Sequence, residues 1–166
     1  MNAFTFTSNY DALIIEARTG GHPWADRHLS WQRLQHLVEL PAVQIRISWP
    51  AGHLTATLDD TPTPRSLGKA LPLASTARTW GEEVYFDTGV RVPRETAARQ
   101  VVEAGTVAFW TDGDALALPY GPTPISRGDE CRLASPCNVL GRLDGDHRLL
   151  ATVREGDPVR VELVAD

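Results

Sequence analysis

The sequence predicts a mostly-β fold, either a sandwich or a barrel built from many short strands. Three observations support this prediction. Short segments in which apolar and polar residues alternate recur from Val43 to the C-terminus, as is typical of half-buried strands. The dipeptide Asp112-Gly113 lies between two apolar runs and is a strong hairpin signal. Only two short stretches in this part of the chain have the character of helices.

The elements follow one another at short intervals. Residues Val43–Trp49 alternate strictly, and His53–Leu58 alternate again after a Pro-Ala-Gly turn, so the two segments predict a hairpin. A short helix is expected from Thr63 to Ala70, because Thr63 can act as an N-cap and Pro64 suits the first helical position. The remaining predicted elements are strands at Ser75–Trp80, Glu83–Phe86, Thr96–Val102, Thr106–Trp110, Ala115–Tyr120, Asn138–Leu143 and Val159–Val164, and a helix at His147–Val153.

Residues 1–42 differ in texture from the rest and are expected to form an N-terminal extension to a domain at residues 43–166. An amphipathic helix is predicted from Ala25 to Leu40. Its apolar face is formed by Trp24, Trp31, Leu34 and Val38. This face is expected to cover the outside of the domain, a sister chain or a partner, so the extension is a candidate assembly module that would make a homo-oligomer.

Composition excludes several classes of partner. The 166 residues carry 16 Lys and Arg against 21 Asp and Glu, for a net charge of −5. This balance argues against nucleic acid, because neutralising phosphates requires a basic face. No apolar run approaches the roughly 18 residues of a membrane span, and no signal-peptide pattern is visible. The expected compartment is the cytoplasm, where Cys131 and Cys137 would remain free thiols near the core.

No metal site and no cofactor are predicted. The cysteines lie too far apart for a zinc pair or a redox C-x-x-C motif. His28 and His36 are eight residues apart, which is not the spacing of a helical metal site, and no carboxylate or cysteine pattern supports His22 as a third ligand.

Three segments, each at a predicted turn or strand, resemble the signature stretches of a prokaryotic family of small cyclophilin-like proteins. They are Trp80-Gly-Glu-Glu-Val-Tyr-Phe86, Gly121-Pro-Thr-Pro-Ile-Ser126 and Ala134-Ser-Pro-Cys-Asn-Val-Leu-Gly-Arg-Leu143. Both the composition of the three segments and their order and spacing along the chain agree with this family. The resemblance extends from about Val43 to the C-terminus and implies a closed β-barrel capped by two short helices.

The same fold holds the peptidyl-prolyl isomerases, so isomerase activity is one hypothesis. The stretch Gly105–Trp110 is similar to a strand that lines the isomerase site, and Pro119-Tyr120 stands where the proline pocket has two phenylalanines. The isomerase Phe-His-Arg motif is absent, and its nearest equivalent is Thr76-Ala77-Arg78. Isomerisation needs an apolar saucer and a guanidinium beside the proline nitrogen. Arg78 would supply the charge, and Phe86, Trp110 and Tyr120 the saucer.

The second hypothesis is a small-molecule or peptide site in a cleft at the side of the barrel. Glu82 and Glu83 are adjacent and must point to opposite faces of a strand, so one of them is expected to face inward or to pack against a partner. A buried glutamate needs a cation or donors, and Arg142 or Arg78 is the expected partner. The carboxylate would act as a general base or a substrate clamp, or else as a structural ion pair.

The Pro-rich loop at residues 121–126 adds hydroxyl groups to this second hypothesis, because it is too rich in proline to pair as a central strand. The candidate catalytic residues are therefore Arg78 and Glu83. The candidate ligand-binding residues are Glu82, Tyr85, Phe86, Trp110, Tyr120, Thr123, Ser126 and Arg142.

Overall fold

The computed structural model describes residues 43–164, which form ten strands, one α-helix and one 3-10 helix. The first half of this part contains β1 (Val43–Trp49), β2 (Gly52–Leu58), α3 (Pro62–Ala70), β3 (Leu73–Thr76), β4 (Arg78–Thr79) and β5 (Glu83–Asp87). The second half contains β6 (Arg99–Val102), β7 (Thr106–Trp110), β8 (Ala115–Pro119), β9 (Cys131–Asp144), η1 (His147–Thr152) and β10 (Pro158–Leu163). The predicted extension, with its tryptophan-bearing face and three histidines, lies outside the described residues.

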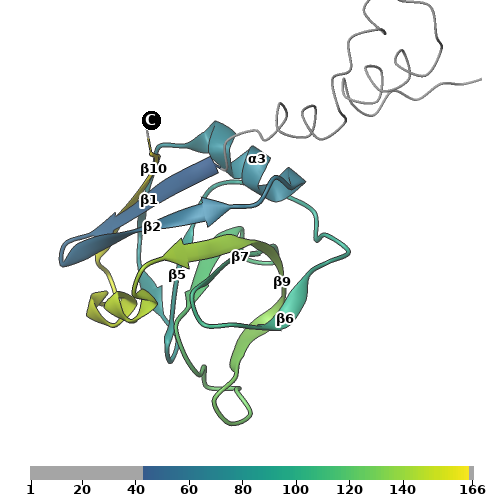
Figure 1. Cartoon of the computed structure of the whole chain (residues 1–166), viewed down its shortest axis with the longest axis vertical. Coiled ribbons are helices and arrows are strands. Elements are labelled where there is room, and N and C mark those ends of the chain that lie inside the picture. Colours follow the sequence, from purple (N-terminus) through teal and green to yellow (C-terminus); the bar gives the residue numbers. More distant parts are fainter. Residues whose placement is uncertain (1–42, 165–166) are drawn as a thin grey trace, which may run out of the picture. The chain divides into compact units, whose positions relative to one another are not determined.

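The strands form a nearly closed antiparallel β-barrel (Figure 1). Their order in the sheet is β3-β10-β1-β2-β9-β7-β8-β5-β4, and β6 pairs with β9 beside this path. The first and last strands of this order, β3 and β4, are separated in the chain only by Ala77. One extended segment therefore pairs with β10 on one side and with β5 on the other, which brings the sheet back onto itself.

The single strand predicted at Ser75–Trp80 is thus wrong in detail, because it is two strands with different partners. Ala77 is fully buried at the break, where its N–H donates to the carbonyl of Asp157 (2.8 Å). The carbonyl of Ala77 accepts in turn from the N–H of Gly156 (2.9 Å). The alternation of residues 75–80 does not reveal this change of partner. The residues that pair with Ala77 at the break, Gly156 and Asp157, lie in a loop far away in the sequence.

The main hydrophobic core fills the barrel interior. It is formed by the apolar side chains that alternate with polar ones along the strands, as predicted. In β1 the side chains of Ile45, Ile47 and Trp49 are buried, while their neighbours are more exposed. The largest fully buried side chains include Phe86 on β5 and Phe109 on β7. Burial of each such side chain contributes about 1.5–3 kcal/mol.

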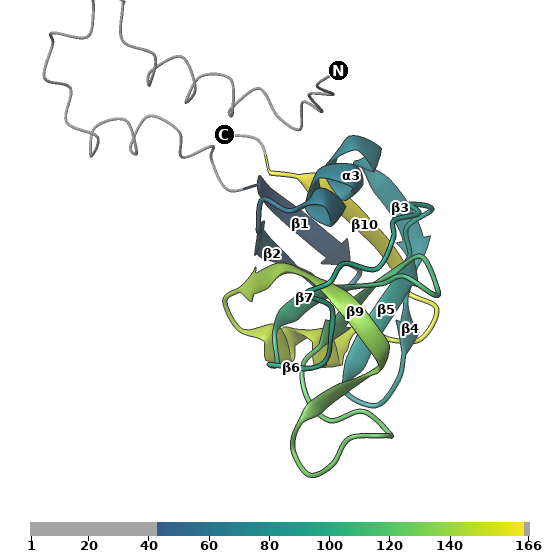
Figure 2. The same cartoon turned by 90° about the vertical axis from the view of Figure 1, so that its right-hand side faces the viewer.

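The two helices lie on opposite sides of the barrel in both views, with α3 at the top (Figures 1 and 2). The predicted N-cap is wrong by two residues, since α3 begins at Pro62 after Thr61. Thr63 instead donates its hydroxyl to the Glu95 carboxylate. The second helix, η1, is a 3-10 helix whose N-cap Asp146 accepts from the N–H of Arg148. The barrel is therefore mostly β, with few helices.

The strand β9 is longer than predicted, because it begins at Cys131 rather than Asn138. It pairs with β2, β7 and β6 in turn, and its pairing with β7 shifts register between Val107 and Ala108. Such a bulge bends a strand. Gly141 lies at the crossing with β2, where an added Cβ would come within 2.1 Å of the Thr57 carbonyl oxygen. Figure 2 shows β9 arching across the barrel wall.

The bend in β9 creates a second, smaller apolar cluster. The buried residues of this cluster are Ala108, Ala117, Leu133 and Cys137, and Tyr85, Val102 and Trp110 pack against them. The strands β5, β7 and β8 contribute to this cluster the residues that alternate with their main-core residues, so the cluster lies on the outer face of the wall. The predicted burial of both cysteines is confirmed, and both thiols are free. Within residues 43–164, no helix is long and apolar enough to cross a membrane.

Candidate functional site

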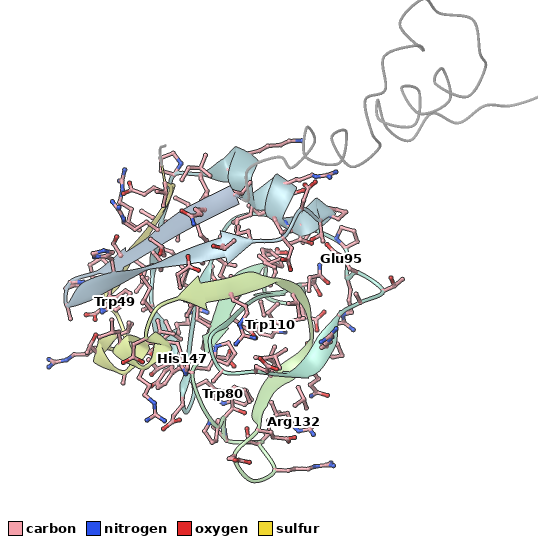
Figure 3. All side chains as sticks on the ribbon, viewed as in Figure 1. Trp49, Trp80, Glu95, Trp110, Arg132 and His147 are labelled. Carbon is pink, nitrogen blue, oxygen red and sulfur yellow. The ribbon has the colours of Figure 1, made fainter. Side chains whose placement is uncertain are left out.

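A pocket of about 160 Å³ opens beside the outer apolar cluster. The residues that line it are Trp80, Glu83, Tyr85, Trp110, Ala117, Leu133, Ala134 and Cys137. Three come from β5 and β8, one from β7, three from the β9 arm at residues 131–137, and Trp80 from the turn before β5. In Figure 3, Trp110 lies within the curve of β9 and Trp80 lies below it.

Strand alternation decides which side chains of β5 reach the pocket. Val84 and Phe86 point into the main core, so Glu83 and Tyr85 must point outward. Across the sheet, Tyr85 pairs with Ala117, which pairs with Ala108. The two alanines have small side chains, so the outer surface of the sheet is recessed between the rings of Tyr85 and Trp110. These rings meet edge to face, with centroids 6.3 Å apart and planes at 86°.

The indole of Trp110 is held in place by a chain of hydrogen bonds. Its Nε1–H donates to Ser135 Oγ (3.0 Å), and Ser135 Oγ donates to Asp112 Oδ2 (2.9 Å). Asp112 accepts in turn from Arg94 at both carboxylate oxygens (2.9 and 3.0 Å). Below the ring, Gly113 leaves the necessary space, because a Cβ there would lie 2.3 Å from the indole carbons. These contacts therefore fix the orientation of the Trp110 ring in the pocket wall.

Glu83 is the central polar group of the pocket. Its side chain is buried, with 6% of the residue exposed. Its Oε2 atom is buried and accepts no hydrogen bond within the described part of the chain. Burial raises the pKa of the Glu83 carboxyl to about 7 from its ordinary value of 4.5. The carboxyl therefore changes its charge near neutral pH.

One acid of the pair is buried, as expected, but Glu83 lies on the outer face of the barrel wall rather than facing the barrel interior, and neither arginine expected as its partner pairs with it. Arg78 binds Asp87 (3.3 Å), and Arg142 binds Glu103. Neither arginine lines the pocket. Arg78 Cζ instead lies 6.0 Å from the centre of the Tyr85 ring. Glu83 is thus not half of an ion pair among residues 43–164.

Cys137 brings a thiol to the same pocket. Burial, with a further contribution from the charge of Glu83, raises the pKa of this thiol to about 12. The thiol donates to the Ser135 carbonyl oxygen (3.3 Å). Because the thiolate is the nucleophile, Cys137 acts here as a packing group rather than as a reactive one.

The remaining predicted site residues lie elsewhere. Phe86 is fully buried in the main core, on the opposite face of β5 from Glu83. Tyr120 packs against the same core, and burial together with the Glu82 charge raises the pKa of its hydroxyl. Glu82 is exposed and lies over Gly121, where a Cβ would clash with its carboxylate.

The hydroxyls of the Pro-rich loop hold the loop itself together. Thr123 Oγ1 donates to the carbonyl of Arg132 (2.5 Å), and Ser126 Oγ accepts from the N–H of Thr123 (2.9 Å). Ser126 Oγ also accepts from the N–H of Arg132 (3.3 Å). These bonds tie the loop to the start of the β9 arm, so Thr123 and Ser126 support the pocket wall without lining it.

Arg142 belongs to a different surface. It lines an open groove of about 620 Å³ together with residues of β2, β6 and β9, among them Arg99 and Val101. The predicted residues therefore divide into three groups. The structure brings together Glu83, Tyr85 and Trp110, places Arg78 at the Tyr85 ring, and leaves the rest outside the pocket.

Sequence reasoning did not select as site residues the five that complete the pocket, which are Trp80, Ala117, Leu133, Ala134 and Cys137. Part of the signal was present, because Ala134 and Cys137 lie in the third signature segment. Asn138 in that segment has a structural role. Its amide donates to Thr63 Oγ1 (2.9 Å) and to the Pro93 carbonyl (3.0 Å), and its Oδ1 accepts from the N–H of Glu95 (2.7 Å).

A family model described as Cyclophilin-like matches residues 43–162. The chain therefore belongs to the cyclophilin-like family, as the resemblance of its three signature segments implied. Among solved structures, it is similar to a hypothetical protein from Archaeoglobus fulgidus whose structure was determined in solution. The two share 38% identity with a TM-score of 0.65, over 74% of this chain and 95% of the other. A comparison with curated proteins gives no match.

Proposed function

We propose that this protein binds a small molecule, or one side chain of a peptide, in the pocket on the outer barrel wall, with Glu83 as the anchor. The observation that carries the proposal is the buried Oε2 atom without a partner. A buried polar atom left without a hydrogen bond costs about 1–3 kcal/mol, and more when it is charged. A ligand that donates to Oε2 would recover this free energy on binding.

The surroundings of Glu83 support binding at this place. The rings of Trp80, Tyr85 and Trp110 offer apolar surface. The hydrogen bond that the Trp110 indole donates to Ser135 holds this ring in position before a ligand binds. Binding sites are typically concave and mostly apolar, with few polar groups. The volume of about 160 Å³ suits a compact ligand or a single side chain. A carboxyl that titrates near neutral pH also suits proton transfer to or from a bound molecule.

The experiment is a titration of the full chain with small amines, amides and alcohols, followed by NMR of the indole N–H groups. We expect ligands to shift the Trp80 and Trp110 signals, which report on the pocket. The Trp49 indole donates to Thr152 (2.9 Å) and does not line the pocket, so its signal serves as an internal control. Glu83→Gln should weaken the shifts and Glu82→Gln should leave them unchanged. If Glu83→Gln has no effect on any ligand, the proposal is wrong.

Prolyl isomerase activity is the second candidate, and one observation favours it. The Arg78 guanidinium lies 6.0 Å from the centre of the Tyr85 ring, at the edge of an aromatic pocket. A guanidinium beside an apolar surface is what the isomerisation needs. A protease-coupled isomerase assay tests it. A rate above buffer that falls in Arg78→Ala would support the activity, whereas no rate, or a rate unchanged in the variant, would exclude it.

A further inference from the structure

We propose that the ligand of the Glu83 pocket is a small protonated amine that keeps at least one N–H, which it donates to Oε2 of Glu83. This inference deepens the proposed function and depends on it. The carbon groups of the amine would lie against the rings of Trp80, Tyr85 and Trp110.

The charge balance of the pocket points to a cation. Glu83 is the only charged side chain among the lining residues, and neither Arg78 nor Arg142 compensates it. Trp80 and Tyr85 bring polar hydrogens but no charge, and the indole N–H of Trp110 already donates to Ser135. A buried carboxylate is stable only when a cation or several donors accompany it. Without a ligand the carboxyl avoids this cost by keeping its proton up to about pH 7. When it is ionised, a protonated amine supplies the positive charge that the pocket lacks.

The aromatic walls favour an organic cation. Aromatic faces attract cations, most strongly when the cation is partly desolvated. The molecule already shows this preference at its surface, where Arg78 lies over the Tyr85 ring and Asp87 compensates its charge. A metal ion fits the pocket poorly, since residues 43–164 contain no group of three His, Cys, Asp or Glu side chains placed to hold one.

The partnerless oxygen distinguishes amines that carry an N–H from quaternary ammonium ions. A quaternary ion satisfies the charge of Glu83 but offers no donor to Oε2. A trialkylammonium ion of nearly the same size compensates the charge of Glu83 and also donates an N–H to Oε2. This pair of cations therefore separates the hydrogen bond from the charge and from the aromatic contact.

The test compares trimethylammonium, tetramethylammonium and tert-butanol as probes on the full chain, at about pH 8, where most Glu83 carboxyls are ionised. The readout is the dissociation constant from the Trp80 and Trp110 indole shifts. We expect trimethylammonium to bind at least about tenfold more tightly than tetramethylammonium, and tert-butanol to bind weakest. Glu83→Gln should abolish the preference for trimethylammonium, and Glu82→Gln, which changes an exposed carboxylate outside the pocket, should preserve it.

Three outcomes would overturn the inference. Equal affinity for the two cations would show that no N–H reaches Oε2. Tighter binding of tert-butanol, unaffected by Glu83→Gln, would show a pocket for neutral ligands. If neutral amides bind in a Glu83-dependent manner and the amines do not, the proposed function survives and the amine assignment fails. A thermal unfolding transition recorded for each variant verifies that it is folded.

Discussion

At the scale of single residues, Glu83 is the position where folding and the proposed binding have opposed requirements. The strand β5 needs alternating apolar side chains, and it has them at Val84 and Phe86. The outward position that β9 covers would also suit an apolar residue. A carboxyl stands there instead, without a partner for Oε2 in the described structure. A residue that lowers stability at a pocket is a functional candidate with a physical reason.

The raised pKa of Glu83 predicts how stability changes with pH. The folded state holds the Glu83 proton up to about pH 7, while the unfolded chain releases it near 4.5. Between these values the folded state binds more protons, so the unfolding free energy falls as pH rises and levels off above about pH 7. The full effect is about 3 kcal/mol, at roughly 1.4 kcal/mol per pKa unit.

Glu83→Gln should remove this dependence, because glutamine does not titrate. Chemical unfolding at about pH 5 and about pH 8 measures it. The variant should gain stability over the wild type at the higher pH, whereas Glu82→Gln should follow the wild type. The neighbouring titratable groups are the thiols of Cys131 and Cys137 and the Tyr85 hydroxyl, and burial raises the pKa of both thiols. Parallel pH curves for wild type and Glu83→Gln would contradict the prediction.

At the scale of elements, the hairpin of β7 and β8 fixes the pocket wall through its turn. The turn was predicted from Asp112-Gly113, and the hairpin is confirmed. The residue with positive φ is Asp114 (50°) rather than the glycine. Gly113 is needed for a different reason, since the Trp110 indole lies where a Cβ would stand. The sequence showed that a turn exists there, but the position of the indole depends on Ser135, which lies on another strand.

Gly113→Ala should therefore weaken ligand binding while the barrel remains folded. The added Cβ would lie 2.3 Å from two indole carbons, so the Trp110 ring must move out of its hydrogen bond with Ser135. We expect the Trp110 indole signal to shift and the affinity to fall by about tenfold, which corresponds to about 1.4 kcal/mol. The matched control is Gly68→Ala in α3, where nothing lies within 4 Å of the new Cβ. An unchanged Trp110 signal in Gly113→Ala would refute this account.

Asn138 connects three elements, and its removal should destabilise the barrel. Its side chain is fully buried and makes one bond to α3 at Thr63 and two to the segment before β6, at Pro93 and Glu95. Asn138→Ala would leave buried groups without partners, at about 1–3 kcal/mol for each group. We expect a loss of about 3 kcal/mol in denaturant unfolding. A loss below about 1 kcal/mol would show that the former partners of Asn138 find other hydrogen bonds in the variant.

At the scale of the whole molecule, the strands were predictable where one face is buried and the other exposed. The strand β1 was predicted with its bounds correct, because Ile45, Ile47 and Trp49 alternate with polar residues. The strand β9 was predicted only in its second half, since its first half lies over the outer wall and includes Pro136 and Ser135. The pocket could not be predicted as a unit, because it forms only where that half of β9 crosses β5, β7 and β8.

The last prediction concerns the barrel without the N-terminal extension. The barrel belongs to a compact unit, Pro41–Asp166, and the family model matches 43–162. The match with the Archaeoglobus protein covers 95% of that protein and 74% of this chain. That protein therefore shows that a chain about as long as the barrel alone can fold.

A variant lacking residues 1–40 should therefore show a single cooperative unfolding transition and keep the Trp80 and Trp110 indole signals. Its mass in solution, compared with that of the full chain, tests the proposed assembly through the predicted helix. A smaller oligomer after truncation supports assembly, equal oligomeric states exclude it, and an unfolded variant would show that the barrel needs its extension.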